Sequence, residues 1–258
     1  MSILRTILEN KLLEVEEARG RIPLAALKER LNNAPLHRPF AAALRRTEIS
    51  VIAEIKKASP SRGILVRDFD HRKLADEFKR GGASALSVLT DKKYFQGDPA
   101  FLIEIRDTVD LPLLRKDFII DEYQVYESKL LGADAILLIV KALSRDQLER
   151  LHEAALSINL EVLVETHTRE EIAEANRIGA GMIGINNRDL ESFEVSLNRS
   201  LELRHYIRPE ALAVSESGIQ TAEDRVKLKN AGFQAILVGE GLVMRGNPAE
   251  ALQDLVRK

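Results

Sequence analysis

The chain has 258 residues, of which 45% are hydrophobic and 30% charged, and its net charge is -2 at pH 7. This composition is typical of a globular protein with a sizeable core, built as one large α/β domain or two small ones. Both signs of charge are spread along the chain, without the basic stripe that nucleic-acid-binding proteins carry. We therefore expect no nucleic-acid partner.

The chain contains no cysteine, which excludes disulfides, thiolate nucleophiles and cysteine-ligated metals. No apolar run approaches the roughly 20 residues that a membrane-spanning helix needs. Residues 1–20 are amphipathic and charged, unlike a signal peptide. We expect a cytoplasmic protein with no membrane partner and, because no exposed apolar stripe is obvious, a monomer.

Three helices are predicted ahead of the first strand. Apolar residues recur at helical spacing in the first helix, and the Asn-Asn-Ala-Pro sequence at 32–35 ends the second. The predicted ranges are 3–18, 23–31 and 40–45. We interpret residues 1–48 as an N-terminal helical extension that lies against a main domain at residues 49–258.

From residue 50 onward, apolar strands alternate with helices without a break. Runs such as Ala-Ile-Leu-Leu-Ile-Val at 135–140 are apolar on both faces, as buried parallel strands are. The predicted strands are 50–56, 85–89, 113–116, 135–140, 161–165, 182–186, 212–215 and 235–238. The predicted helices are 71–80, 99–107, 122–131, 145–157, 169–177, 197–205, 222–230 and 248–256. This alternation predicts an α/β fold, a (βα)8 TIM barrel with the helical extension at its N-terminus.

An internal repeat supports the barrel, because a helix ends in a small-residue turn before a strand about every 50 residues, the length of two βα units. The turns begin at Gly82, Gly132, Gly179 and Gly232, and we interpret these glycines as helix C-caps. No linker or change of composition indicates a second domain. We expect one domain over residues 1–258.

The stretch at 51–63 is an apolar strand that ends in charged and turn residues. Because side chains alternate along a strand, Ile52, Glu54 and Lys56 share one face. The Ser-Pro-Ser sequence at 59–61 ends the strand, and we expect the loop that follows to close over a substrate. An edge strand with solvated charges is the alternative, but polar residues follow other apolar strands in the same way.

In barrels of this kind the active site lies at the carboxyl ends of the strands. Two lysines and up to three carboxylates fall there, and such groups shift one another's pKa values, which yields an acid and a base at neutral pH. A structural network of ion pairs is the alternative. The polar residues at or just beyond the strand ends are Glu54, Lys56, Lys116, Asp117, Glu165, Asn186, Arg188, Glu216 and Ser217.

Two backbone-rich turns follow the last two strands, at Ser217-Gly218 and at Gly239-Glu240-Gly241. Barrels often bind phosphate at this place on exposed N–H groups, with a short extra helix that we expect at 242–244. The third glycine of a dinucleotide fingerprint is missing, so we expect a phosphate site and no nicotinamide cofactor.

The five histidines show no spacing typical of metal ligands. Of the five, only His167, just after the fifth strand, is placed to reach the mouth of the barrel, and we favour its interpretation as a surface residue over that alternative. No Ser-His-Asp arrangement can be assembled from the strand ends. Metal catalysis and acyl transfer are therefore disfavoured, and we expect no metal site.

Seven motifs resemble indole-3-glycerol phosphate synthase and occur in that family's order, from about residue 51 to residue 244. They are Ala-Glu-Ile-Lys-Lys-Ala-Ser-Pro-Ser, Leu-Arg-Lys-Asp-Phe, Leu-Leu-Ile-Val, Val-Glu-Thr-His, Ile-Asn-Asn-Arg-Asp-Leu, Ser-Glu-Ser-Gly-Ile and Leu-Val-Gly-Glu. The resemblance implies a carboxy-lyase of tryptophan biosynthesis that needs no cofactor. Its reaction would be the ring closure of 1-(2-carboxyphenylamino)-1-deoxyribulose 5-phosphate to indole-3-glycerol phosphate, with loss of carbon dioxide and water.

The resemblance also implies roles in proton transfer. Lys116 is the general acid, and Glu165 assists proton transfer. Lys56 acts in dehydration and pairs with phosphate, while Glu54 is the base or a hydrogen-bond partner in the later steps. Attack of an aromatic carbon on a ketone needs an acid at the carbonyl oxygen, which fits this set.

The resemblance further implies that Asn186 and Arg188 hold the substrate's carboxylate and hydroxyls, and that Glu216 supports the lysines. The implied contacts with the rest of the substrate, an anionic sugar phosphate bearing an anthranilate ring, come from Ser59, Pro60, Phe95, Phe118, Leu137, Ile139, Leu190 and Leu237. The implied phosphate contacts come from Lys56, Ser217, Gly218, Gly239 and Glu240. Since a carboxylate repels phosphate, we expect the Glu240 side chain to turn away. Relatives with an N-terminal tryptophan differ from this chain, so contacts from the extension stay unassigned.

Two other functions are open. One is another phosphate-binding barrel enzyme, such as phosphoribosylanthranilate isomerase, which needs no site with two lysines. The other is a barrel that binds sugar phosphates without turnover, or an engineered scaffold. Fold alone does not decide among them.

Overall fold

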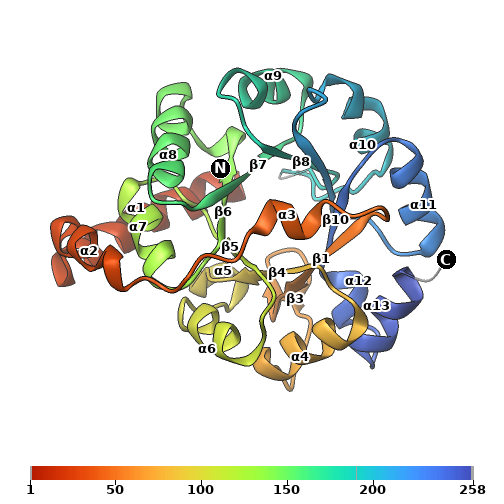
Figure 1. Cartoon of the computed structure of the whole chain (residues 1–258), viewed down its shortest axis with the longest axis horizontal. Helices are drawn as coiled ribbons and strands as arrows, with labels where there is room; N and C mark the ends of the chain where they lie inside the picture. The colour runs from red at the N-terminus through yellow and green to blue at the C-terminus, as the bar shows by residue number, and fades with distance from the viewer. Residues whose placement is uncertain (1, 190, 257–258) are drawn as a thin grey trace.

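The computed structural model describes residues 2–189 and 191–256, which form a closed barrel of eight parallel strands surrounded by helices (Figure 1). The strands pair in the order β1-β10-β9-β8-β7-β6-β5-β4, so the first and last strands close the barrel. Their bounds are β1 Ser50–Ile55, β4 Ala85–Leu89, β5 Leu113–Lys116, β6 Ala135–Ile139, β7 Glu161–Thr166, β8 Met182–Asn186, β9 Leu212–Glu216 and β10 Ala235–Val238. The predicted (βα)8 TIM barrel is confirmed.

The predicted helices are also present. The extension holds α1 Ile3–Arg21, α2 Leu24–Arg30, the 3-10 helix Leu31–Asn33 and α3 Phe40–Leu44. The barrel holds α4 His71–Gly81, α6 Ala100–Thr108, α7 Glu122–Leu130, α8 Arg145–Ser157, α9 Arg169–Arg177, α10 Asn198–Leu203, α11 Ala222–Asn230 and α13 Pro248–Val256, with 3-10 helices at Val140–Ala142 and Arg204–Tyr206.

Three short elements were not predicted from the sequence. The strands β2 Ala58–Ser59 and β3 Gly63–Ile64 form an antiparallel hairpin after β1, and α5 Lys92–Phe95 follows β4. Such elements are too short to show a hydrophobic period. The short extra helix is α12 Glu240–Val243, which begins two residues earlier than expected.

Alternate residues of the strands point into the barrel. In β1, Ile52 packs inside with Leu237 of β10, while Val51 and Ala53 pack outward with Phe78 of α4. Both faces are therefore apolar along most of each strand, as in other buried parallel sheets. Polar groups enter the interior mainly at the strand ends.

Helix α3 closes the amino-terminal end of the barrel. Phe40 and Leu44 are fully buried among the inward-pointing side chains. The carboxylate of Glu161, at the start of β7, accepts hydrogen bonds from the main-chain N–H groups of Phe40 at 2.6 Å and Ala41 at 2.9 Å. These bonds satisfy donors that the first turn of a helix leaves free. The cavity described below lies at the opposite end.

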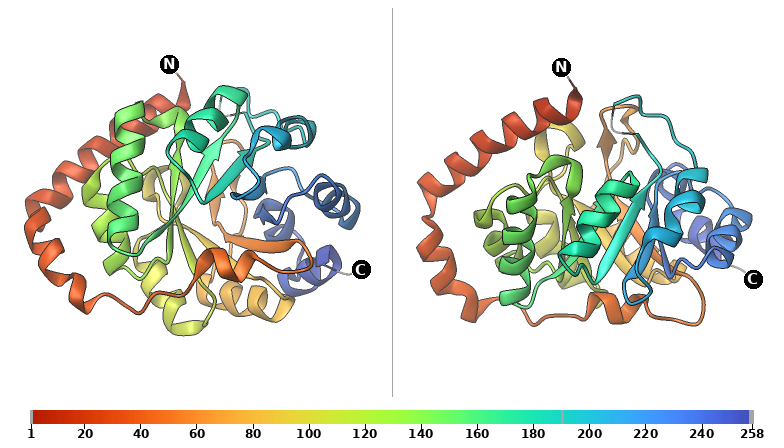
Figure 2. Two further views of the ribbon diagram at one scale, coloured as in Figure 1. Left: turned by 45° about the horizontal axis from the view of Figure 1, so that its top comes forward. Right: turned by 90° about the horizontal axis from the view of Figure 1, so that it is seen from above.

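Helix α1 begins near the carboxyl ends of the strands and runs along the outside of α7 away from them (Figure 2). Val15 packs there with Tyr123 and Tyr126 of α7. Neither α1, with 19 residues, nor any other helix in the described ranges has the apolar length that a membrane crossing requires.

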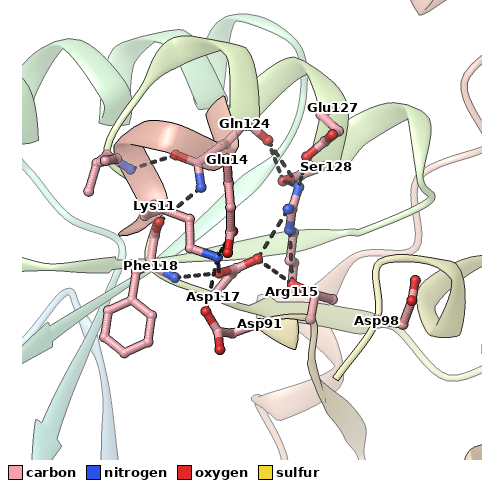
Figure 3. A network of polar contacts seen from close by, with 12 residues as sticks. Lys11, Glu14, Asp91, Asp98, Arg115, Asp117, Phe118, Gln124, Glu127 and Ser128 are labelled. Atoms are coloured by element: carbon pink, nitrogen blue, oxygen red, sulfur yellow. Dashed lines mark hydrogen bonds and ion pairs between the residues drawn. The ribbon is translucent and has the colours of Figure 1, made fainter. Parts of the chain in front are cut away.

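A buried cluster of charges anchors α1 to the end of β5 (Figure 3). The Lys11 ammonium lies 2.6 Å from Glu14, 2.9 Å from Asp117 and 3.1 Å from Asp91. Asp117 also pairs with Arg115 at 3.1 Å. Burial alone would lower the pKa of Lys11, but Asp117 and Asp91 raise it overall. The carboxylates thus hold the buried ammonium in its charged form.

We expect Lys11→Met to lower the free energy of unfolding by about 3 to 5 kcal/mol, because it leaves buried carboxylates without their cation. Lys28→Met is the matched control, since Lys28 pairs with Glu122 at 3.0 Å on the exposed side of the extension. The control should cost less than about 1 kcal/mol. Urea denaturation checks both variants, and equal losses would contradict the anchoring role of Lys11.

Candidate active site

A cavity of about 250 Å³ opens at the carboxyl ends of the barrel strands. Every predicted site residue within the described ranges lies on its wall; Leu190, also predicted, lies outside those ranges. The predicted substrate, phosphate and catalytic residues on the wall are Glu54, Lys56, Ser59, Pro60, Phe95, Lys116, Phe118, Leu137, Ile139, Glu165, Asn186, Arg188, Glu216, Ser217, Gly218, Leu237, Gly239 and Glu240.

Lys116 lies between buried carboxylates. Its Nζ is 2.9 Å from Glu165 Oε2 and 3.1 Å from Glu216 Oε2, and these residues come from the carboxyl ends of β5, β7 and β9. Burial alone would lower the pKa of Lys116, but the charges of Glu165, Glu216 and Glu54 raise it overall. Lys116 is therefore protonated at neutral pH.

The two carboxylates beside Lys116 titrate differently. Burial raises the pKa of Glu216 to about 7, and the negative charge of Glu165 adds to the increase against the pull of Lys116. Although burial opposes it, the Lys116 charge lowers the pKa of Glu165 to about 2. One lysine cannot offset both carboxylates, so one carboxyl group keeps a proton up to near neutral pH.

A second pair lies beside the first. Glu54 Oε1 is 2.7 Å from Lys56 Nζ, as expected for residues on one face of β1. Burial would raise the pKa of Glu54, but Lys56 and Lys116 lower it overall. Acidic and basic groups thus alternate along one wall, an arrangement that can both donate and accept protons.

Two glycines make room for these carboxylates. A Cβ at Gly184 would lie 2.1 Å from Glu216 Oε1, and one at Gly239 would lie 2.6 Å from Glu54 Oε1. Both carboxylates lean across neighbouring backbone that only glycine leaves open. Gly184 was not identified from the sequence as a site residue. The one signal for it there was a glycine inside an apolar strand.

Asn187, also missed, shapes the turn after β9. Its Nδ2 donates to Ser215 Oγ and to the main-chain oxygen of Ser217, both at 3.0 Å. Ser217 and Gly218 both have positive φ, of 67° and 79°. Such a conformation is costly for serine and needs support from its surroundings. The amide of Asn187 provides that support.

The expectation that Glu240 turns away is wrong. Its carboxylate lies 3.0 Å from Arg188, 3.3 Å from Arg62 and 3.7 Å from Lys56, and it lines the cavity. Arg188, Arg62 and Lys56 converge on this corner of the cavity, and their combined field attracts the Glu240 carboxylate into the cavity.

The interpretation of His167 as a surface residue is also wrong. Only 6% of its side chain is exposed, and it lies between Glu165 and Glu171. The residue follows β7 directly, and the first turn of α9 covers it. Among the described residues, no cluster of three or more His, Asp or Glu side chains has a geometry suited to a metal ion.

The apolar side of the cavity combines barrel and extension. The Phe95 and Phe118 rings lie 6.1 Å apart between centroids. Further apolar lining residues, which no local pattern in the sequence identified, are Ile3, Leu4, Ile7, Leu89, Phe193, Val195, Ile219 and Val238. Those from α1 reach the cavity only because α1 is anchored on the barrel.

Comparison with known proteins shows the family of this chain. The family model of indole-3-glycerol phosphate synthase matches residues 4–255. The chain belongs to the indole-3-glycerol phosphate synthase family. An indole-3-glycerol phosphate synthase from Chloroherpeton thalassium is 49% identical over 247 residues, covering 94% of this chain and 95% of that protein. One from Alkaliphilus metalliredigens is 44% identical, covering 98% and 97%.

A solved structure of a 3-hexulose-6-phosphate synthase superimposes on this member of the indole-3-glycerol phosphate synthase family with a TM-score of 0.67. It covers 80% of this chain and 98% of its own, at 14% sequence identity. Similarity at this level shows the shared barrel fold alone.

The raised pKa of Glu216 predicts a pH dependence for this indole-3-glycerol phosphate synthase family member. Between an unfolded value near 4.5 and a folded value of about 7, the folded state binds the extra proton. The free energy of unfolding should therefore fall as pH rises through this window, by up to about 1.4 kcal/mol per pH unit. Glu216→Gln should lack this fall in urea denaturation between pH 4.5 and 8, whereas the exposed Glu17→Gln should keep it. Parallel curves for all three proteins would contradict the assignment.

Proposed function

We propose that the chain catalyses the reaction of its family, ring closure of 1-(2-carboxyphenylamino)-1-deoxyribulose 5-phosphate to indole-3-glycerol phosphate. The observation that carries the proposal is the Lys116 ammonium, held 2.9 Å from Glu165 and 3.1 Å from Glu216 inside the cavity. Members of the family are carboxy-lyases of tryptophan biosynthesis, and the proposal assigns that role to this chain.

The cavity is suited to a substrate with two anionic groups and an aromatic ring. The phosphate binds at Lys56 and the turns formed by Ser217, Gly218, Gly239 and Glu240. Asn186 and Arg188 hold the carboxylate and hydroxyls. Arg188 lies on the cavity wall, with its guanidinium 3.0 Å from the Glu240 carboxylate. The anthranilate ring packs on the apolar side formed by Pro60, Phe95, Phe118, Leu137, Ile139 and Leu237, and Ser59 contacts the substrate from the same wall. Leu190, which the resemblance also implies, lies outside the described residues.

Ring closure begins with the ketone. Lys116 donates its proton to the ketone oxygen while the ring carbon that bears the carboxylate attacks the ketone carbon. The new carbon–carbon bond leaves the ring without aromaticity and with a positive charge. Departure of carbon dioxide returns the electron pair to the ring and restores aromaticity.

Dehydration completes the indole. Lys56 donates a proton to the departing hydroxyl, which leaves as water, and Glu54 or Glu165 accepts the proton released from the adjacent carbon. Glu216 stabilises the lysines electrostatically. Each step transfers a proton, forms or breaks a C–C bond, or breaks a C–O bond, without net oxidation, so the proposal includes no redox cofactor and no metal.

The proposal also covers the organisation of the chain. Residues 1–258 form one domain, with the helical extension at 1–48 and the barrel at 49–258. The buried pairs of Lys11 support this unity, since they join α1 to the barrel. We propose a cytoplasmic monomer without nucleic-acid or membrane partners.

Lys116→Met should reduce the rate of indoleglycerol phosphate formation about a hundredfold or more, because it removes the general acid. Lys229→Met is the matched control, since Lys229 pairs with Glu48 at 2.6 Å near the amino-terminal end of β1. Product fluorescence after substrate addition measures both rates. A wild type that binds the substrate without forming an indole is a binding protein or scaffold, and the proposed roles then fail.

Glu240→Gln should tighten the binding of inorganic phosphate about three- to tenfold, a gain of roughly 0.7 to 1.4 kcal/mol. The substitution removes a carboxylate that competes with phosphate for Lys56 and Arg188. Isothermal titration calorimetry measures the affinity, with Glu17→Gln on α1 as the control. Weaker binding would show instead that Glu240 serves to orient Arg188.

A further inference from the structure

His167 joins the candidate active site to the surface. Its Nδ1 lies 3.3 Å from Glu171 Oε2, and the same oxygen accepts a hydrogen bond from the His167 main-chain N–H at 2.7 Å. Its Nε2 is buried, has no hydrogen-bond partner among the described residues, and lies 3.7 Å from Glu165 Oε1. An unpartnered buried nitrogen that faces a carboxylate calls for an explanation.

The contacts of Glu165 continue this series of polar groups from His167 toward the cavity. Its second oxygen, Oε2, lies 2.9 Å from Lys116 Nζ. Glu171 stands in the first turn of α9, where the helix dipole favours a carboxylate, and 16% of its side chain is exposed. Four polar groups therefore lead from solvent to the ammonium of Lys116, in the order Glu171, His167, Glu165 and Lys116.

The proposed reaction needs such a route because of its proton balance. The substrate enters with an ionised carboxylate, which leaves as neutral carbon dioxide. Two protons are given to the ketone oxygen as it becomes water, and one is recovered from carbon. Each turnover therefore consumes one proton, which must return to the lysines from solvent while product or substrate fills the cavity.

We propose that His167 is a positioning residue that relays this proton from Glu171 to Glu165. The imidazole starts with its hydrogen on Nε2, takes a proton at Nδ1 from the side of Glu171, and gives the Nε2 hydrogen to Glu165 Oε1. It is left with its hydrogen on Nδ1, and a turn of the ring about the Cβ–Cγ bond restores the starting form. The resulting carboxylic acid turns about its Cγ–Cδ bond and protonates the neutral amine of Lys116. The relay rests on the proposed function, since only that reaction sets the proton balance.

The charges around the relay favour this direction. The titratable groups that face the imidazole are Glu165 from β7 and Glu171 from α9. Lys116 from β5 faces Glu165 from the other side, with Glu216 of β9 beyond it. Burial raises the pKa of Glu165 and the charge of Lys116 lowers it, so this lowering is lost while Lys116 is neutral. Glu165 can then accept a proton from His167 and pass it to the amine of Lys116, whose pKa the surrounding carboxylates raise overall against its burial.

His167→Gln tests the relay, because glutamine fills the space and forms hydrogen bonds but cannot carry a proton through. His167 is not part of the cavity wall, so KM should stay within about twofold. The first turnover uses the proton already on Lys116 and should keep its wild-type rate. Later turnovers should slow about tenfold or more, which gives a burst of one product per enzyme.

Added imidazole buffer should restore the later turnovers of His167→Gln in proportion to its concentration, and the wild type should not respond. Glu171→Gln interrupts the same route at its exposed end and should show the same buffer dependence, which covers a failure of His167→Gln to fold. His71→Gln is the matched control, since His71 pairs with Glu104 at 2.9 Å outside the barrel and should behave as wild type.

The two proposals can fail separately. Product formation by the wild type, with steady-state rates of His167→Gln and Glu171→Gln within twofold of it and independent of buffer, would overturn the relay alone. Absence of product with the wild type would overturn the proposed function and the relay with it.

Discussion

The ammonium of Lys116 and the carboxylates around it are the interaction on which the rest of the site depends. Burying this lysine costs free energy that its neighbours Glu165 and Glu216 offset, and burying those carboxylates is tolerable only because the lysine is there. These three charged side chains are therefore stable in the interior only together. The barrel holds these three side chains together, because β6 pairs with both β5 and β7, and β8 pairs with both β7 and β9.

The end of β5 links this group to the N-terminal extension. Lys116 points into the barrel, while its neighbours Arg115 and Asp117 point outward and join the cluster that holds Lys11. Alternation of side chains along one strand thus places the cavity lysine and a structural anchor within three residues. The same anchor places the start of α1 on the cavity wall, so the extension and the site depend on one strand end.

Charge in the cavity is arranged in two zones. The deep zone, around Lys116, has more carboxylates than lysines, which raises the pKa of Lys116 overall against its burial. Burial, together with the charge of Glu165, raises the pKa of Glu216 to about 7. The corner near Glu240 has three cations and one carboxylate. In the proposed reaction the corner attracts the anionic substrate, while the reacting carbon atoms of the substrate meet the deep zone, where protons are exchanged. His167 extends the deep zone toward the surface through Glu171.

The sequence by itself determined the barrel, because short apolar runs alternate with stretches of helical period along the chain, and the eight barrel strands lie within one residue of their predicted bounds. It also placed Glu54, Lys116, Glu165 and Glu216 at one end, since the carboxyl ends of parallel strands meet there. Only the tertiary structure decided the direction of Glu240, the burial of His167 and the contribution of α1 to the cavity. The direction of Glu240 and the contribution of α1 depend on groups distant in sequence, which are the cations Arg62 and Arg188 for Glu240 and Asp117, the partner of Lys11, for α1. The burial of His167 depends on how α9 packs against β7, although its neighbours Glu165 and Glu171 lie close in sequence. Local pattern carries no information on such encounters, because they arise only when the closed barrel brings the segments together.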